Sequence, residues 1–180
     1  AKGQNITQRL ILREKLKCQN FEWYLNNVWP QNFFPSEKRF FGRIKHMSSD
    51  KCIKKPINKG VLGQPMGSAT LGVCLKDDDL NGMFVMTEDG IIMTDESICL
   101  DAPQKGEFEG ESKGNVKVMG CSGYPRQKWV YKKNTYQLKH FSTGQCLSVS
   151  SVTSESTPLI LQPCSSSKNQ NWVLDPVSWK

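Results

Sequence analysis

Six of the seven cysteines recur at a nearly constant interval along this chain of 180 residues. One set is separated by 47 and 47 residues: Cys52, Cys99 and Cys146. The other set is separated by 47 and 43 residues: Cys74, Cys121 and Cys164. Each member of the first set is therefore followed by a member of the second, 22, 22 or 18 residues later. This spacing predicts three copies of one structural unit, each with an internal cysteine pair.

Aromatic residues keep the same period as the cysteines. Two QxW motifs lie 43 residues apart, Gln127-Lys128-Trp129 and Gln170-Asn171-Trp172, and Gly82-Met83-Phe84 takes the corresponding place in the first unit. Short alternating runs broken by Gly, Asp, Ser and Asn indicate β-hairpins between them. A unit of this size cannot bury a core alone, but three units around a pseudo-threefold axis can. We therefore predict an all-β fold, a β-trefoil.

The predicted β-trefoil covers residues 40–180, with repeats at about 40–87, 88–133 and 134–180. We expect Trp129, Trp172 and Phe84 to share one core, because large rings bury the most area per residue. Each QxW glutamine is expected to hydrogen-bond backbone in a turn. The predicted disulfides close the loops Cys52–Cys74, Cys99–Cys121 and Cys146–Cys164. Each loop of about 20 residues would contribute roughly 3 kcal/mol in a chain-entropy estimate, which matters in a chain with only 37% hydrophobic residues.

Residues 1–30 have a different pattern, and residues 31–39 are predicted to be a linker. Leu10, Leu12 and Leu16 recur at roughly helical spacing, and Thr7 or Asn5 is expected to cap the helix. An aromatic stretch follows over residues 21–29. Thirty helical residues do not make a domain, so this segment is either the end of a preceding domain or a strut packed on the trefoil.

The N-terminal segment and the repeats together resemble a known enzyme family. From Leu12 to Pro30 the chain reads LREKLKCQNFEWYLNNVWP, and a QxW trefoil follows. This order resembles the polypeptide N-acetylgalactosaminyltransferases, Golgi enzymes that start mucin-type O-glycosylation on Ser and Thr. The resemblance implies that residues 1–30 are the helical tail of a truncated catalytic domain and that a ricin-type lectin domain follows. It also implies a location in the Golgi lumen.

The catalytic chemistry of that family requires residues that this chain does not contain in the required motif. The family binds UDP-GalNAc and Mn²⁺ through an Asp-x-His motif and a further His, whereas the two histidines here, His46 and His140, lie in no such motif. We expect both to be surface or hairpin residues. Asp77-Asp78-Asp79 is interpreted as a solvated loop rather than a metal site. No catalytic residue, metal site or cofactor is therefore predicted within this chain; Mn²⁺ and UDP-GalNAc are implied only for the parent enzyme.

The resemblance also implies a sugar site formed by three kinds of residue. The family uses the aspartate of Cys-Leu-Asp, a stacking aromatic ring, and an asparagine just before QxW. The second repeat offers Asp101, Tyr124 and Arg126, the last in place of the asparagine. Arg126 can donate to a sugar hydroxyl, or it can pair with Asp101 and block the site. The alternative for Asp101 is a turn residue that caps a hairpin.

The other two repeats depart further from the binding pattern. In the first repeat Lys54 replaces the aspartate, and a lysine offers only donors, so we predict no binding there. In the third repeat Ser148 is too short to replace a carboxylate, although Asn169 before QxW remains a weak candidate. We therefore place the sugar-binding site in the second repeat.

The seven cysteines indicate an oxidising compartment, and one of them, Cys18, lies in the N-terminal segment beside a glycosylation signal. Cys18 has no partner once the three pairs are made, and it is either a free thiol or bonded to sequence outside this chain. We expect the second. Asn5-Ile6-Thr7 is a sequon, which makes Asn5 an N-glycosylation candidate.

The chain has a net charge of +7, which bears on the kind of partner it binds. Lysines and arginines are scattered, which favours a solvated basic surface over nucleic-acid binding, and no apolar run of membrane-spanning length occurs. We expect no membrane contact by this segment. The favoured function is a lectin domain that binds GalNAc on glycopeptides or mucin-type glycoproteins and steers its own catalytic domain to glycosylated acceptors. The alternatives are a non-binding structural module for that domain, or a basic trefoil that binds polyanionic glycans.

Overall fold

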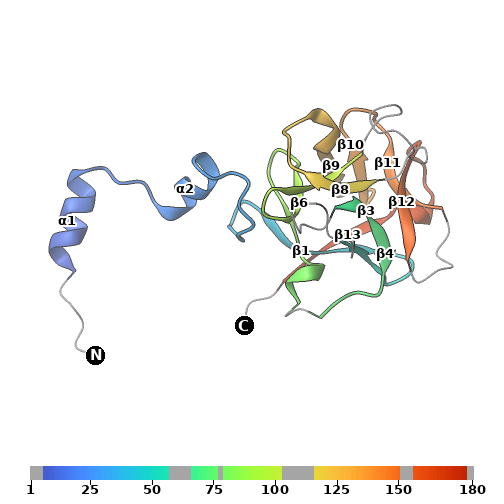
Figure 1. Ribbon diagram of the computed structural model, residues 1–180, viewed down its shortest axis with the longest axis horizontal. Helices are drawn as coiled ribbons and strands as arrows, with labels where there is room; N and C mark the ends of the chain where they lie inside the picture. The colour runs from blue at the N-terminus through green and yellow to red at the C-terminus, as the bar shows by residue number, and fades with distance from the viewer. Residues whose placement is uncertain (1–5, 57–65, 77–78, 103–115, 151–155, 178–180) are drawn as a thin grey trace. The chain divides into compact units, whose positions relative to one another are not determined.

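The computed structural model describes residues 6–56, 66–76, 79–102, 116–150 and 156–177. The chain divides into two compact units, Ala1–Asn32 and Phe33–Lys180. The described part of the first unit contains two helices, and the second unit contains the β-strands (Figure 1). The division at residue 32 lies inside the region that the sequence predicts as a linker, and Phe33 packs edge-on against Phe41 at 5.7 Å between ring centroids.

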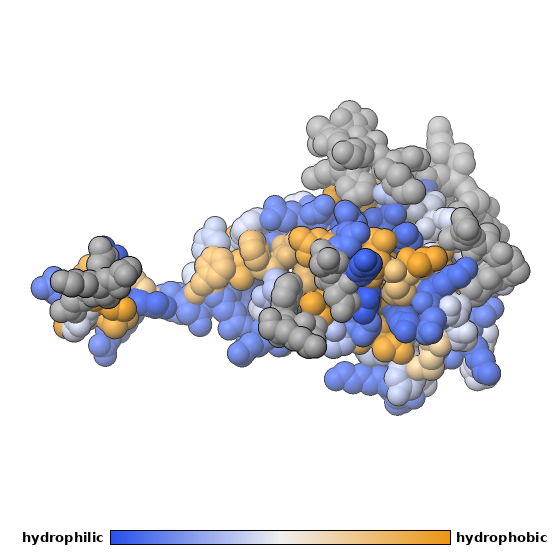
Figure 2. All heavy atoms as spheres, turned by 90° about the horizontal axis from the view of Figure 1, so that it is seen from below, coloured by the Kyte–Doolittle hydropathy of each residue, from blue (hydrophilic) through white to orange (hydrophobic). Residues whose placement is uncertain are grey.

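The first unit is helical, as predicted, but its first helix begins differently. Helix α1 spans Thr7–Lys15, and Ile6 stands at its cap position with no side-chain hydrogen bond. The prediction that Thr7 caps the helix is therefore wrong, because Thr7 is already the first helical residue; Asn5 lies outside the described residues. Helix α1 buries none of its residues, and Leu10 and Leu12 are exposed. Hydrophobic and hydrophilic residues are mixed over the surface of the chain (Figure 2).

Helix α2 spans Phe21–Asn27 and has a well-formed start. The side chain of Asn20 accepts a hydrogen bond of 2.7 Å from the backbone N–H of Trp23. Asparagine is among the best residues for this position, because its short side chain satisfies a free N–H of the first turn. Beyond the helix, the amide of Asn32 donates to the carbonyl of Leu25 at 2.8 Å, and both residues are buried.

The second unit contains three sets of strands in chain order. The first repeat has β1 (Phe40–His46), β2 (Cys52–Lys54), β3 (Gly67–Ser68), β4 (Thr70–Gly72) and β5 (Phe84–Met86). The second has β6 (Ile92–Asp95), β7 (Ile98–Asp101), β8 (Lys117–Gly120) and β9 (Trp129–Lys132). The third has β10 (Gln137–His140), β11 (Cys146–Val149), β12 (Thr157–Gln162) and β13 (Trp172–Pro176). A one-turn 3-10 helix precedes the last strand of each repeat: η1 (Leu80–Gly82), η2 (Pro125–Gln127) and η3 (Lys168–Gln170).

The first and last strands of the repeats join into a closed ring. Strand β1 pairs with β5 and β13, β5 pairs with β6, and β9 pairs with β10, all antiparallel. An isolated bridge between Ile91 and Lys128 connects the start of β6 to β9. A hydrogen bond of 2.7 Å from the Trp172 N–H to the Tyr136 carbonyl connects β13 to the β9–β10 hairpin. Closure of this kind leaves these six strands no free edge.

Three backbone hydrogen bonds mark the pseudo-threefold axis. The N–H of Ala69 donates to the carbonyl of Val116 at 2.9 Å, Val116 donates to Leu159 at 2.9 Å, and Leu159 donates back to Ala69 at 3.0 Å. All three residues are fully buried. One residue from each repeat thus contributes equally to a cyclic contact, which confirms the predicted β-trefoil.

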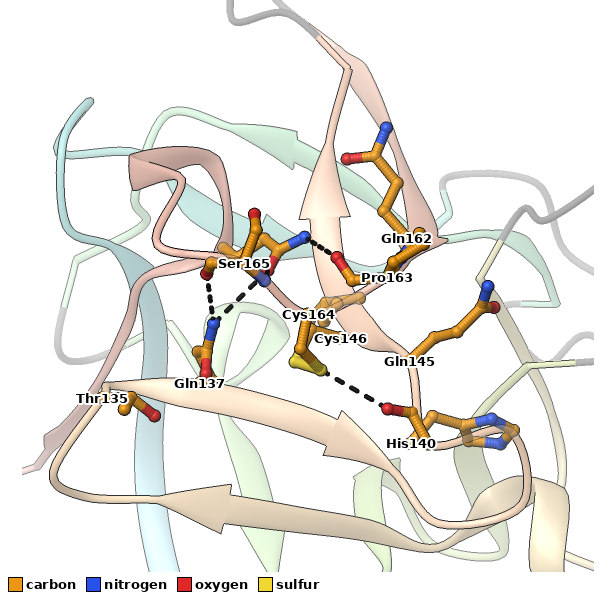
Figure 3. Close-up of a disulfide and its surroundings, with 12 residues drawn as sticks. Thr135, Gln137, His140, Gln145, Cys146, Gln162, Pro163, Cys164 and Ser165 are labelled. Carbon is orange, nitrogen blue, oxygen red and sulfur yellow. Dashed lines mark hydrogen bonds between the residues drawn. A yellow bond between two sulfur atoms is a disulfide. The ribbon is translucent and has the colours of Figure 1, made fainter.

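The predicted core and disulfides are also confirmed. Trp129, Trp172 and Phe84 are buried together in one hydrophobic cluster. The indole N–H groups of Trp129 and Trp172 donate to the carbonyls of Leu100 and Leu147, each at 3.0 Å. All three predicted disulfides are present, with Cα–Cα distances of 4.8, 5.0 and 4.9 Å; the third is shown in Figure 3.

Of the two positions expected for the histidines, surface or hairpin, the hairpin position is confirmed, since β1 pairs with β2 and β10 with β11, but the surface position is wrong. His46 ends β1 and His140 ends β10, and both are fully buried. Each ring lies 5.1 Å, centroid to centroid, from a QxW tryptophan, Trp172 for His46 and Trp129 for His140. The last residue of each strand faces inward, because its side chain alternates with the solvent-facing one before it.

Burial of both histidines predicts a pH-dependent stability. Desolvation lowers the pKa of His46 and of His140, although contacts with backbone carbonyls, and with Asp101 for His140, act in the opposite direction. The unfolded chain, with a pKa of about 6.5, therefore takes up protons first as the pH falls. We expect the free energy of unfolding to be greatest above pH 6.5 and to fall below it, by linkage. The two histidines together contribute a slope equivalent to at most two protons per molecule.

Urea unfolding at pH 7.5, 6.5 and 5.5 measures this slope, because carboxylates stay largely ionised over that range. A double variant, His46→Gln with His140→Gln, serves as the comparison. An equally steep slope in the double variant would contradict the assignment to these two side chains.

Candidate functional site

The three candidate residues of the second repeat lie together in the structure. Asp101 is the last residue of β7, Tyr124 precedes η2, and Arg126 lies within η2. The Nε of Arg126 is 3.1 Å from Oδ2 of Asp101. The guanidinium carbon of Arg126 also lies 5.2 Å from the centroid of the Tyr124 ring. Arg126 therefore contacts both the carboxylate and the aromatic ring.

Asp101 is covered by these contacts. Its side chain is 0% exposed, that of Arg126 is 20% exposed, and Tyr124 is 58% exposed. Oδ2 of Asp101 accepts a second hydrogen bond, 2.8 Å long, from the side-chain amide of Gln127. A sugar hydroxyl can reach this carboxylate only if the guanidinium of Arg126 moves aside, whereas the Tyr124 ring is already accessible.

Gln127 connects the site to the backbone of its turn. Its Oε1 accepts from the N–H of Ser122 at 2.8 Å, and its Nε2 donates to the carbonyl of Gly120 at 2.9 Å. These bonds confirm the role predicted for the QxW glutamine. Its additional bond to Asp101 was missed in the sequence analysis, although its position directly after Arg126 could have suggested it.

The third repeat reproduces the turn but lacks the carboxylate. Gln170 accepts from the N–H of Ser165 and donates to the carbonyl of Pro163, both at 2.9 Å. Ser148 is buried, and its hydroxyl donates to the side chain of Gln162 at 2.8 Å. Asn169 lies in η3, half-buried. Gln137 of β10 reaches the Ser165 carbonyl from the side of this turn, at 2.7 Å (Figure 3).

In the first repeat, Lys54 ends β2 opposite Thr70, so a lysine stands in the position of Asp101. A Cβ at Gly82, which replaces the QxW glutamine, would lie 3.0 Å from Cβ of Leu75. A glutamine at this position would require its neighbour to shift.

The remaining candidate residues lie apart from this cluster. Cys18 is exposed and is the one cysteine without a disulfide in the chain; its pairing outside the chain stays a prediction. Asp77 and Asp78 lie outside the described residues, and Asp79 caps η1 through a 2.9 Å bond to the N–H of Asn81. Among the described residues, no three His, Cys, Asp or Glu side chains form a group that could hold a metal ion.

Comparison with known proteins identifies the fold family. Residues 40–172 match the ricin-type β-trefoil lectin domain. The chain belongs to this family. It is 27% identical to polypeptide N-acetylgalactosaminyltransferase 3 of Drosophila melanogaster, over 98% of this chain and 35% of that protein. The matched residues reach into all three repeats and include both QxW motifs.

Two solved structures have the same fold. The structure of GalNAc-T7 with UDP, GalNAc and Mn²⁺ aligns with a TM-score of 0.62 at 21% identity, covering 96% of this chain and 30% of that one. The C-half of an earthworm R-type lectin in complex with GalNAc aligns with a TM-score of 0.59 at 14% identity, covering 74% of this chain and 96% of that one.

The chain thus spans about a third of the length of the transferases that it matches. In the part of the chain that the structure describes, neither helix has the length and apolar character needed to cross a membrane.

Proposed function

We propose that the second repeat is a carbohydrate-binding site for GalNAc carried on a peptide. The observation that carries this proposal is the convergence of Asp101, Tyr124 and Arg126 at one place in a ricin-type lectin domain. A carboxylate can accept hydrogen bonds from two neighbouring hydroxyls, and an exposed ring can stack on the apolar face of a galactose-type sugar. The GalNAc bound by the earthworm lectin supports the choice of sugar.

Binding in this site requires a rearrangement of one side chain. The guanidinium of Arg126 leaves Oδ2 of Asp101 and turns toward the incoming sugar, where it can donate to a hydroxyl. Gln127 stays bound to Asp101 and keeps the carboxylate oriented. The backbone of the η2 turn and the Cys99–Cys121 disulfide need not move.

We further propose that the chain is the C-terminal part of a polypeptide GalNAc-transferase of the Golgi lumen, which starts mucin-type O-glycosylation. Within such an enzyme a weak site is sufficient, since a Kd near 1 mM corresponds to about −4 kcal/mol. Tethering would raise the effective concentration of an already glycosylated substrate beside the catalytic domain. In this proposal Mn²⁺ and UDP-GalNAc are bound by the catalytic domain of the longer protein, as the resemblance to the transferases implies.

The test is a titration of the protein with a GalNAc-bearing glycopeptide, followed by NMR or calorimetry. We expect saturable binding that is lost, by at least about tenfold in Kd, in Asp101→Ala, because the acceptor of two hydroxyl bonds is gone. Asp175→Ala is the matched control. Asp175 also forms an ion pair with an arginine, Arg43, but it lies on β13, outside the second-repeat site. Equal binding by Asp101→Ala and the wild type would refute this site.

A second function is favoured by the complete burial of Asp101. If Arg126 never leaves the carboxylate, the trefoil is a structural module that supports the catalytic domain. If neither the wild type nor a variant without Arg126 binds glycopeptide at millimolar concentration, the structural role is supported over sugar binding.

A further inference from the structure

The backbone carbonyl of Arg126 is held by two donors from different repeats. The N–H of Ala102, directly after Asp101, donates to it at 3.1 Å. Nε2 of His140, from β10 of the third repeat, lies 2.9 Å from the same oxygen. The first contact ties the η2 turn to β7, and the second ties it to the neighbouring hairpin. Arg126 can therefore rotate its side chain while its backbone stays in place.

The hydrogen-bond partners of His140 define which nitrogen carries the proton. A carbonyl only accepts, so Nε2 must be the protonated nitrogen and Nδ1 the acceptor. Nδ1 lies 2.9 Å from the hydroxyl of Thr143, which in turn accepts a bond of 3.3 Å from the N–H of Gln145. Burial lowers the pKa of His140, which keeps the ring in this neutral form at neutral pH. The side chain is thus committed to donating to the Arg126 carbonyl.

A similar arrangement occurs once more around the pseudo-threefold axis. His46, His140 and Met93 each lie six residues before the first cysteine of their repeat. Nδ1 of His46 lies 2.8 Å from the hydroxyl of Ser49, as Nδ1 of His140 does, at 2.9 Å, from that of Thr143. Burial lowers the pKa of His46, and the backbone of Lys168 and Asn169 in η3 acts to raise it. The buried Nε2 of His46 has no hydrogen-bond partner among the described residues, unlike Nε2 of His140. Each histidine therefore faces the turn that carries the QxW glutamine of the preceding repeat.

Met93 is the counterpart of the histidines in the second repeat, and the turn that precedes it is the one without a QxW glutamine. Met93 is buried, and a thioether offers no N–H for a turn carbonyl. A histidine therefore lies beside each of the two turns that contain a QxW glutamine. Methionine takes its place beside the turn in which Gly82 replaces that glutamine.

We propose that His140 is a positioning residue of the second-repeat site, which fixes the η2 turn carrying Tyr124 and Arg126 through the Arg126 carbonyl. This inference rests on the proposed function for its effect on sugar binding. The third repeat, which has no carboxylate of its own, contributes in this way to the site of the second.

The experiment compares His140→Met, which mimics Met93, with His46→Met as a matched control. Both variants remove a buried imidazole beside a QxW tryptophan, so both are expected to lower thermal stability. We expect only His140→Met to weaken GalNAc-glycopeptide binding, by about three- to tenfold, the range for one hydrogen bond. His140→Gln keeps a donor at nearly the same reach and is expected to restore binding toward that of the wild type.

Amide hydrogen exchange provides a readout that needs no ligand. In His140→Met we expect faster exchange at Gln127 and Lys128, whose N–H groups close the η2 turn onto Tyr124 and Pro125. In His46→Met the exchange at Gln127 and Lys128 should be unchanged, because His46 makes no hydrogen bond to the η2 turn and its Nε2 has no partner among the described residues.

The two readouts separate the outcomes. Faster exchange at η2 in His140→Met, with no glycopeptide binding by the wild type, would support the positioning of the turn and refute the proposed function. Unchanged exchange at η2, or binding by His140→Met as tight as that of the wild type, would overturn the positioning role. Equal weakening of binding by His46→Met would overturn it as well, since the effect would then follow from general destabilisation.

Discussion

Replacing Arg126 by asparagine should tighten GalNAc-glycopeptide binding by about tenfold, equivalent to ~1.4 kcal/mol. In the wild type, an incoming sugar must displace a charged hydrogen bond of 3.1 Å between Arg126 and Asp101, and such bonds contribute about 1.5–3 kcal/mol. Asparagine is too short to hold the carboxylate in this way, and its amide matches the residue that the transferase family places there. Calorimetric titration of both proteins under the same salt conditions measures the difference.

The same substitution should lower stability while it raises affinity. Asp101 is fully buried, so loss of the guanidinium leaves its charge with less compensation, at a cost of roughly 1–3 kcal/mol in unfolding free energy. Arg43→Asn is the control, because Arg43 is also about one-fifth exposed and bonds Asp175 at 2.7 Å. It should lower stability without changing affinity. If Arg126→Asn binds glycopeptide no better than the wild type, Arg126 does not obstruct the site.

Of the substitutions considered, Trp129→Ala should lower the free energy of unfolding the most. Its ring is 1% exposed and lies in the cluster shared by all three repeats. Loss of a buried tryptophan costs about 3–5 kcal/mol, and the carbonyl of Leu100 would also lose its indole donor. A thermal transition lower by about 10 °C or more is expected for a domain of this size.

The control for this prediction is Phe141→Ala. Phe141 directly follows His140 but is 62% exposed, so its removal should shift the transition little. Thermal unfolding followed by circular dichroism compares the two variants. A small shift for Trp129→Ala, similar to that for Phe141→Ala, would show that the three repeats do not depend on one shared core.

The trefoil could be predicted because its signals are periodic and redundant. The cysteines and the QxW motifs recur with one interval, and each repeat must bury its rings against the others. The start of α1 could not be predicted in the same way: Thr7 has the right chemistry for a cap, but a single helix start carries no repeated signal, and Ile6 occupies the position instead.

The sequence by itself determined the three repeats, their disulfides, the shared aromatic core and which repeat retains Asp101. Only the tertiary structure decided that Arg126 and Gln127 cover Asp101, and that the two histidines are buried. It also decided that His140 of one repeat holds the Arg126 carbonyl of another. Composition and spacing record what each repeat contains. Contacts between repeats depend on how the strands of the closed ring pair. This pairing decides which side chains face inward and which turn each of them contacts.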